Sequence, residues 1–384
     1  LPLMLALSST VLYSVDANAQ DREERRVLKA SEVSREQVSA EFRKMARSKR
    51  HQEMEFAEDL LRRGHLEGDR SAEMMLRLAD LYFQEGRDIF MGEMEAYEIE
   101  FDACFNNPNC STEDMKADNG RSYKWQAKSV RLYKRILQQF PNFRRADEAT
   151  FYLATALQDT GNRPDGIKYF KTLVRSYPDS GFVPDAFVQI GEYYFDENNA
   201  YRALQAYQKA AKFRNSEKFG FALYKLSWCY YNVAEFGKAI DTMKRVVALE
   251  GSEVDAKKKK TAIQLSEEAL KDLVRFFADA GDMDGAIQYF TQLGKTDLIR
   301  SMLKRLAGTY LEQGKFEQTI QTYRRLIARN PNAADTPDYQ DEIIQAYLKM
   351  GKKQEAVEEI EKLRRTYGPG SNWARQNAAD ADAT

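Results

Sequence analysis

Six consecutive segments of this chain repeat one pattern of small, bulky and turn-forming residues over residues 147–369. Each segment has an amphipathic stretch, a turn with Gly or Asn, and a second amphipathic stretch that Pro often follows. In the first segment these positions are Leu153, Ala154, Leu157, Gly161, Asn162, Gly166, Phe170, Leu173 and Pro178. The other segments start near Pro184, Gly220, Glu267, Arg300 and Pro337. Such a period predicts helical hairpins that stack, because one hairpin alone cannot bury its apolar face.

Each position of the repeat has a packing reason. Ala or Gly where two helices cross lets their backbones approach closely, and bulky residues at i, i+3 and i+4 fill the seam. Pro after the second helix prevents its continuation. Val274 and Ile344 stand where the first helix has a small residue in other units, and Gly166 and Thr319 stand where the second helix has Ala. We expect these units to pack more loosely or to cross at another angle.

This pattern resembles the tetratricopeptide repeat (TPR) family. The resemblance implies an all-α fold, a TPR-type α-solenoid in which antiparallel helical hairpins form a right-handed superhelix. It also implies that the first helix of each unit lines a concave groove, where a segment of a partner protein binds.

The remaining sequence suggests a plan of five regions. A signal peptide covers residues 1–19, an N-terminal helical cap residues 20–70, and a TPR-like hairpin with a Cys-containing insertion residues 71–146. The array of about six TPR units covers residues 147–369, and a disordered tail covers residues 370–384.

The first residues predict export. Leu1 to Val15 is apolar and leads to Ala17-Asn18-Ala19, so signal cleavage is expected between Ala19 and Gln20. The chain opens with Leu and lacks a basic leader, so we expect the signal peptide to be truncated. No Cys follows the cleavage position, which favours soluble export over a lipid anchor. A short buried helix or a membrane anchor is the alternative interpretation.

The expected compartment bears on the oxidation state of the three Cys residues. Cys104 and Cys110 frame a short turn-rich loop, and export makes an oxidising environment, so a disulfide between them is one interpretation and two free thiols the other. Cys229 lies within a helical pattern and is expected to be a buried, inert thiol.

A candidate partner surface emerges from the first helices of the array. Aromatic residues recur at helical spacing beside the seam positions, and basic residues take the equivalent places in the next two units. The predicted partner-binding residues are Val188, Phe195, Phe221, Tyr224, Trp228, Tyr231, Lys271, Arg275 and Lys304. Together they predict a groove with an aromatic floor and a basic wall, suited to a segment with apolar anchors and acidic flanks. The alternative is that the rings pack between neighbouring repeats.

No catalytic or cofactor chemistry is recognisable. The only histidines are His51 and His65, and no nucleophile elbow, P-loop or zinc-ligand spacing occurs, so we expect no enzyme activity, no cofactor and no metal. Lys and Arg number 58 against 59 Asp and Glu, which gives no indication of a nucleic-acid partner. The sequence does not indicate an oligomeric state.

The style of the repeats is similar to that of periplasmic and outer-membrane-associated TPR proteins of Gram-negative bacteria. The residues 133–141 and 169–178, each an aromatic and basic helix that ends in Pro, carry this similarity. It implies a non-enzymatic scaffold or adaptor in the periplasm that associates with outer-membrane machinery. A chaperone-like binder of exported clients, a structural spacer and a secreted location remain alternatives.

Overall fold

The computed structural model describes residues 41–113, 115–249, 256–294 and 296–378. The described residues form helices joined by turns and loops, and they contain no strand. The chain divides into two compact units between residues 166 and 167. Within the described residues, no helix combines the length and the apolar character that a membrane span needs. The predicted signal peptide, with Ala19 and Gln20, lies outside the described residues.

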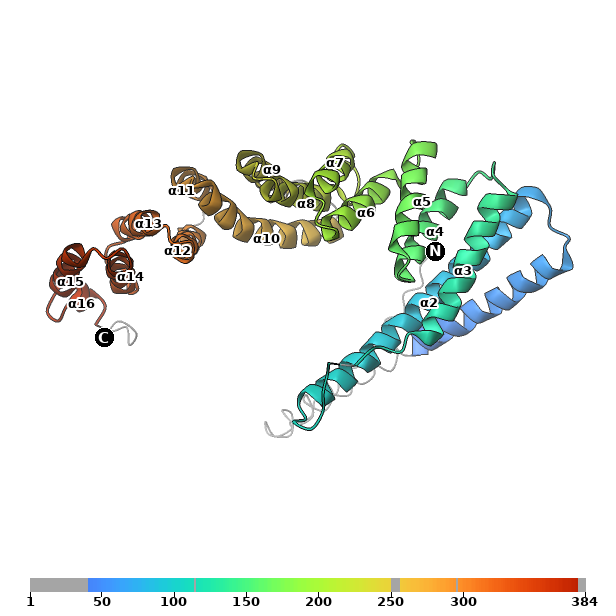
Figure 1. Ribbon diagram of the computed structural model, residues 1–384, viewed down its shortest axis with the longest axis horizontal. Coiled ribbons are helices and arrows are strands. Elements are labelled where there is room, and N and C mark those ends of the chain that lie inside the picture. Colours follow the sequence, from blue (N-terminus) through green and yellow to red (C-terminus); the bar gives the residue numbers. More distant parts are fainter. Residues whose placement is uncertain (1–40, 114, 250–255, 295, 379–384) are drawn as a thin grey trace, which may run out of the picture. The chain divides into compact units, whose positions relative to one another are not determined.

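The first unit is a set of antiparallel helices, drawn in blue to green in Figure 1. Its elements are a helix over residues 41–63, α2 (Gly68–Phe105), α3 (Gly120–Gln139) and α4 (Ala146–Asp159). α2 packs along α3, and α3 packs along α4. α2 does not end near Gly86, where the repeat pattern has a turn. A Cβ at Gly86 would lie 3.0 Å from the Cγ of Gln126, so this glycine permits a close approach of α2 to α3 inside one long helix.

A buried carboxylate holds the N-terminal helix to α2. Glu85 is fully buried, and its two oxygens accept hydrogen bonds from Arg47 Nε (2.8 Å) and Arg50 Nη1 (2.9 Å). His51 Nε2 lies 3.1 Å from the same carboxylate. Burial acts to raise the pKa of Glu85, but its hydrogen bonds to His51 and the arginines lower that pKa overall. The helix over residues 41–63 is therefore held by polar contacts as well as by its small apolar face, Met54 and Ala57.

A second carboxylate joins α2 to α3. Tyr133 of α3 donates a hydrogen bond of 2.7 Å to Asp80 of α2. Burial raises the pKa of Asp80 to about 6, although the hydrogen bond from Tyr133 opposes the rise. The folded chain therefore holds a proton on this carboxyl group in a pH range where the unfolded chain has lost it.

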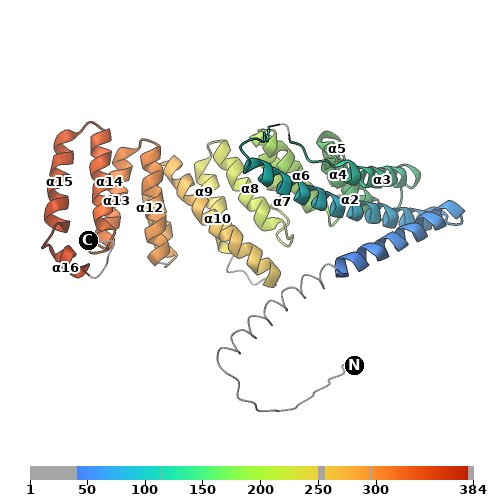
Figure 2. The same ribbon diagram turned by 90° about the horizontal axis from the view of Figure 1, so that it is seen from below.

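The boundary between the units falls within α5 (Arg163–Ser176). The second unit contains α5 from Ile167 onward and a series of helical hairpins (Figures 1 and 2). Its helices are α6 (Val183–Asp196), α7 (Ala200–Ala210), α8 (Phe219–Asn232), α9 (Phe236–Ala248), α10 (Ala256–Ala280), α11 (Met283–Gln292), α12 (Thr296–Glu312), α13 (Phe316–Arg329), α14 (Thr336–Lys349) and α15 (Lys353–Tyr367). Consecutive helices pack on each other, and α10 also packs on α8 and α12. The predicted all-α solenoid of hairpins is confirmed.

The turns between paired helices share one backbone geometry. Gly281, Gly314 and Gly351 each have a positive φ, between 69° and 74°. In the hairpin of α8 and α9 the same position is Ala234, with φ 60°. This conformation is costly for a residue with a Cβ, so the stacking of the hairpins imposes it against the local preference.

Small residues at the helix crossings are in tight contact. A Cβ at Gly166 would lie 2.8 Å from the carbonyl oxygen of Ala154, so the glycine at this position marks a closer approach and not looser packing. The substituted positions Val274, Ile344 and Thr319 are all buried. Our expectation of loose packing is therefore wrong for Gly166, and burial of the other three residues gives it no support.

The C-terminal tail is ordered further than the sequence suggested. A short helix, α16 (Asn372–Gln376), follows α15 and is capped by Ser371, whose Oγ accepts the backbone N–H of Ala374. Trp373 is buried against Tyr367, and its Nε1 donates to the carbonyl oxygen of Ala333 (2.8 Å). The prediction of disorder from residue 370 is wrong for residues 371–377. Although this segment is mostly polar, burial of the Trp373 side chain holds it against the preceding helices. Residues 379–384 lie outside the described ranges.

Gly191→Ala tests the crossing of α6 and α7. A Cβ at this position would lie 2.6 Å from the ring of Tyr207, which is itself fully buried. We expect the substitution to lower the free energy of unfolding by about 1–3 kcal/mol, because the ring has no free space into which to move. Gly237→Ala in α9, where a Cβ meets nothing within 4 Å, is the matched control and should cause no loss. Chemical denaturation followed by circular dichroism measures both, and equal behaviour of the two variants would contradict the close-approach argument.

Asp80→Asn tests the buried carboxyl group. Since the folded pKa is raised to about 6 from the ordinary value of 3.8, the unfolding free energy of the parent chain should fall as pH rises through this window. The Asn variant keeps an acceptor for Tyr133 but has no proton to lose. Its stability relative to the parent is therefore expected to rise between pH 4 and 6 and then to level off. Urea denaturation at a series of pH values measures the unfolding free energy of both proteins. If the difference between them does not change with pH, the raised pKa of Asp80 is refuted.

Candidate functional site

The predicted partner-binding residues are spread over four helices of the second unit. Phe221, Tyr224, Trp228 and Tyr231 lie on α8, Lys271 and Arg275 on α10, and Lys304 on α12, with Val188 and Phe195 on α6. Val188 is only 3% exposed and packs with Ala210 and Ala222 in the core between α6, α7 and α8. Its assignment to a partner surface is therefore wrong, because no partner can reach it without opening the core.

Phe195 of α6 and Phe221 of α8 share a cation, Lys225 of α8. The Lys225 ammonium lies 4.6 Å from the ring centre of Phe195 and 5.5 Å from that of Phe221, and it also pairs with Glu192 at 3.0 Å. Both rings are half-buried. These contacts join α6 to α8 and leave only the ring edges accessible.

The polar ends of the α8 aromatics are directed at α10. Tyr224 Oη donates to Asp272 Oδ2 at 2.7 Å, and Trp228 Nε1 donates to the same oxygen at 3.1 Å. One helical heptad further on, Tyr231 donates to Asp279. We call Tyr224, Trp228 and Tyr231 with their α10 partners Asp272, Phe276 and Asp279 the aromatic seam.

The apolar parts of the same rings also meet α10. The Trp228 ring lies edge-on to Phe276 with centroids 5.1 Å apart, and Tyr231 stacks on Phe276 at 4.6 Å. Phe276 is fully buried, whereas the three α8 rings are half-buried. The choice that the sequence left open is thereby resolved for this face, since the rings serve mainly as packing between α8 and α10.

Burial sets the protonation state of the seam. It raises the pKa of Asp272, against the hydrogen bonds from Tyr224 and Trp228, which lower it. Burial and the hydrogen bond to Asp272 raise the pKa of Tyr224 to about 12, and burial together with Asp279 raises that of Tyr231. The phenols therefore remain donors at neutral pH, and the seam is a structural network with no group poised to exchange protons.

The expected basic wall is a surface of mixed charge. Arg275 lies over the rings of Trp228 (5.8 Å) and Tyr231 (5.6 Å) and donates to the Tyr231 hydroxyl at 3.2 Å. Lys271 pairs with Glu268 at 2.8 Å, and Lys304 lies 5.4 Å from the ring centre of Tyr339. All three side chains are exposed. The predicted basic residues are therefore accessible, but each cation already contacts a carboxylate or a ring.

A hollow of about 600 Å³ opens between α10 and α12 beside the seam. Its lining residues are Glu268, Lys271, Asp272, Val274, Arg275, Arg305, Thr309, Glu312 and Gln313. Gln313, which follows the end of α12, donates to Asp279, so the aromatic seam extends across this hollow to the turn after α12. Two of the predicted residues, Lys271 and Arg275, are brought together here, whereas Lys304 is not among the lining residues.

Sequence reasoning missed the carboxylates and the α12 residues of this hollow. Asp272 and Asp279 are seven residues apart, as are Tyr224 and Tyr231, and this equal spacing was the available signal for their pairing. Arg305 and Glu312 are also seven apart, but nothing in the sequence relates them to α10.

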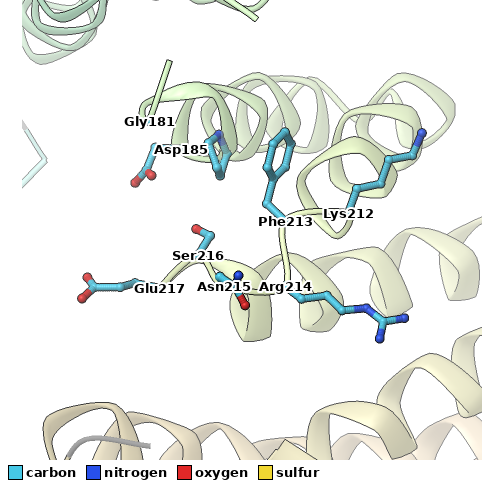
Figure 3. Close-up of a pocket in the computed structure, with 9 residues that line it drawn as sticks. Gly181, Asp185, Lys212, Phe213, Arg214, Asn215, Ser216 and Glu217 are labelled. Carbon is cyan, nitrogen blue, oxygen red and sulfur yellow. The ribbon is translucent and has the colours of Figure 1, made fainter. Parts of the chain in front are cut away.

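A second hollow, of about 790 Å³, lies between the start of α6 and the loop from α7 to α8. Figure 3 shows the charged ends of Lys212 and Arg214 extending to one side, whereas those of Asp185 and Glu217 extend to the other. These groups do not converge on one point, so the hollow is not built to hold a charged ligand. Across the described ranges, no group of three or more His, Cys, Asp and Glu side chains could hold a metal.

The hairpins and their turn geometry define the chain as an α-solenoid of the helical-repeat class. The tetratricopeptide repeat family model matches residues 148–180, 221–249 and 305–333, so these segments are similar to that family. These segments contain the hairpins of α4 with α5 and α8 with α9, and the second half of α12 with α13. Repeats of this family generally mediate protein–protein interaction and typically form non-catalytic scaffolds.

Several solved structures are similar to parts of the chain. The MamA protein is 16% identical, covers 62% of this chain and 96% of its own, and gives a TM-score of 0.28. A tetratricopeptide repeat protein from Parabacteroides merdae is 17% identical over 56% of this chain and 78% of its own (TM-score 0.34). The C-terminal part of a TPR repeat-containing protein from Cytophaga hutchinsonii is 16% identical over 74% and 98% (TM-score 0.37). No curated protein sequence matches the chain.

Trp228→Ala tests whether the seam is packing. The substitution removes the edge contact with Phe276 and one hydrogen bond to Asp272, so we expect a loss of about 2–4 kcal/mol of unfolding free energy. Tyr201→Ala, at a ring that is 71% exposed, is the control and should change stability by less than about 0.5 kcal/mol. Thermal and urea denaturation measure both variants. An unchanged melting temperature for Trp228→Ala would show that the ring is free for a partner after all.

Proposed function

We propose that this chain is a non-enzymatic scaffold or adaptor of the bacterial cell envelope, which holds a segment of a partner protein against α10 and α12. The observation that carries the proposal is the hollow of about 600 Å³ between these helices, with Lys271, Arg275 and Arg305 beside Glu268 and Glu312. A hollow of this size that exposes both charge signs suits a polypeptide, which offers cations, anions and backbone groups along its length.

The seam prepares this surface for binding. Arg275 is held over Trp228 and Tyr231, so its guanidinium group is oriented before a partner arrives. The accessible edges of the same rings offer apolar contact beside the charged groups. We therefore infer a partner segment with charges of both signs and at least one apolar anchor, whereas the sequence led us to expect apolar anchors with acidic flanks.

An envelope location is part of the proposal. It is supported by the apolar leader with its Ala19–Gln20 cleavage position and by the disulfide between Cys104 and Cys110, which suits an oxidising compartment. The similarity in repeat style to periplasmic TPR proteins favours association with outer-membrane machinery. Secretion beyond the cell is the competing location.

The test uses rim residues that the fold does not need. Lys271→Glu combined with Arg305→Glu reverses the exposed cations of the hollow, and Lys353→Glu combined with Arg364→Glu on α15 makes the same change in charge elsewhere. Each protein is expressed in a Gram-negative host, recovered from the periplasm with Gln20 as its expected first residue, and used to capture cross-linked envelope proteins. We expect the parent and the α15 variant to hold the same partner, and the rim variant to lose it by roughly tenfold or more.

Four outcomes would count against parts of the proposal. Equal capture by the rim variant would remove the α10–α12 surface from the interaction. Capture of many unrelated unfolded clients would favour a chaperone-like binder, and full function of the rim variant in the envelope without any bound partner would favour a spacer. A chain that stays in the cytoplasm with its leader intact would remove the envelope location while leaving the binding surface open to test.

A further inference from the structure

α2 extends well beyond the helix on which it packs. Glu93 accepts the backbone N–H groups of Arg121 and Ser122 at 3.2 Å each, so α3 begins beside this residue. The rest of α2, up to Phe105, adds roughly 18 Å of helix at 1.5 Å per residue. The chain returns through residues 106–113 and 115–119, and the disulfide between Cys104 and Cys110 closes the bend. We call residues 94–119 the arm, which Figure 1 shows as the part of α2 beyond the start of α3.

The arm is acidic and carries exposed apolar side chains. Its sequence contains seven carboxylates and one lysine, a net charge of −6 within a chain of net charge −1. Ile99 and Phe105 are 67% and 73% exposed. Glu95, Glu98 and Asp102 are exposed too, and none of them forms an ion pair within the described residues.

α3 has the opposite composition. It contains six basic residues and no acidic one, a net charge of +6. Five of them follow a 3,4,3,4 spacing that places them on one helix face: Arg121, Lys124, Lys128, Arg131 and Arg135. Four of these are exposed, and Lys128 lies over the Trp125 ring at 4.4 Å. We call these five residues the basic stripe.

The arm and the stripe share a spacing and a length. Glu95, Glu98, Asp102 and Phe105 follow one another at intervals of 3, 4 and 3 residues, which matches the stripe. The helical part of the arm spans roughly 18 Å, and the stripe from Arg121 to Arg135 spans roughly 21 Å. Two helices with such matched seams of opposite charge can pair along their length, as flanking charges do in coiled coils.

The two surfaces cannot meet within one molecule. α3 turns Ser122 and Gln126 towards α2, because both lie against the Cβ position of Gly86. Lys124 is two residues away from Gln126, roughly 200° around the helix, so it faces away from α2. The Lys128 ammonium lies 5.0 Å from the ring centre of Tyr82 on α2, roughly 18 Å along that helix from the start of the arm. In addition, the arm lies beyond the start of α3 and not beside the stripe. Only the stripe of another molecule can therefore reach the arm.

We infer that the arm is a docking surface for a second copy of this chain and that it binds along the basic stripe of α3. The carboxylates of the arm pair with the stripe, and Phe105 and Ile99 pack on the aliphatic stems of its Lys and Arg residues. The arm and the stripe are different surfaces, so the contact either closes reciprocally in a dimer or continues from copy to copy. Exposed ion pairs are screened by salt, so the association weakens as ionic strength rises.

Charge reversal with exchange of partners tests this inference. The arm variant carries Glu95→Lys, Glu98→Lys and Asp102→Lys, and the stripe variant carries Lys124→Glu, Arg131→Glu and Arg135→Glu. Sedimentation velocity and light scattering of the full chain with its disulfide intact report the oligomeric state at low and high ionic strength. We expect the parent to associate at low ionic strength, each variant alone to associate roughly tenfold more weakly or worse, and an equimolar mixture of the two variants to recover association.

A third triple variant makes the same change in charge as the arm variant, on residues of the second unit that belong to neither surface. Asp341→Lys, Glu358→Lys and Glu361→Lys on α14 and α15 should leave the association unchanged, since these exposed residues belong to neither surface. Circular dichroism confirms that each variant is folded, and the milder arm variant Glu95→Gln with Glu98→Gln and Asp102→Asn replaces the arm variant if that one unfolds. A parent that is monomeric at low ionic strength, or a mixture that fails to associate when both variants are folded, would overturn the inference.

Discussion

The close approach of paired helices is the constraint on which the second unit depends. Gly191 lies where α6 crosses α7, and the ring of Tyr207 occupies the space that a Cβ would need. Once two helices are held this near, the turn that joins them must reverse the chain over a short distance. The turns of the hairpins therefore share one backbone conformation. Ala234 shows the strength of this requirement, because it adopts the positive φ that Gly281, Gly314 and Gly351 have in their turns. Packing therefore overrides local preference where the two conflict.

The aromatic seam shows how a solenoid can use rings that look like a binding site. Tyr224, Trp228 and Tyr231 are too polar at one end for a dry core and too apolar for open solvent. Asp272 and Asp279 resolve this conflict, since they accept the hydroxyl and indole donors while Phe276 fills the space between them. What remains for a partner is the outer edge of the seam and the mixed charges around the hollow between α10 and α12. Binding and folding thus share residues, but they use different atoms of them.

The first unit uses charge in another way. Its inner carboxylates, Glu85 and Asp80, are buried and matched by arginines or by a phenol. The carboxylates of the arm have no such neighbours, although α3 carries six cations close by in the sequence. Helix geometry explains the difference, because the face of α3 that meets α2 presents Ser122 and Gln126, while four of its six cations are exposed. Charges that one molecule does not satisfy within itself remain available between molecules.

The amino-acid sequence alone determined the repeat, the all-α hairpin fold and the small-residue crossings, because these depend on local periodicity that a reader can count. It also located Lys271 and Arg275, and it identified the two cysteines that the structure joins, although it left that bond open. Tertiary structure decided the rest. Val188 is buried, the aromatic face packs on α10, and Trp373 orders a tail of polar composition, since each outcome depends on partners far away in the chain. The position of a residue in the sequence specifies the face of the helix on which its side chain lies. Whether that face is buried depends on which other helix packs against it.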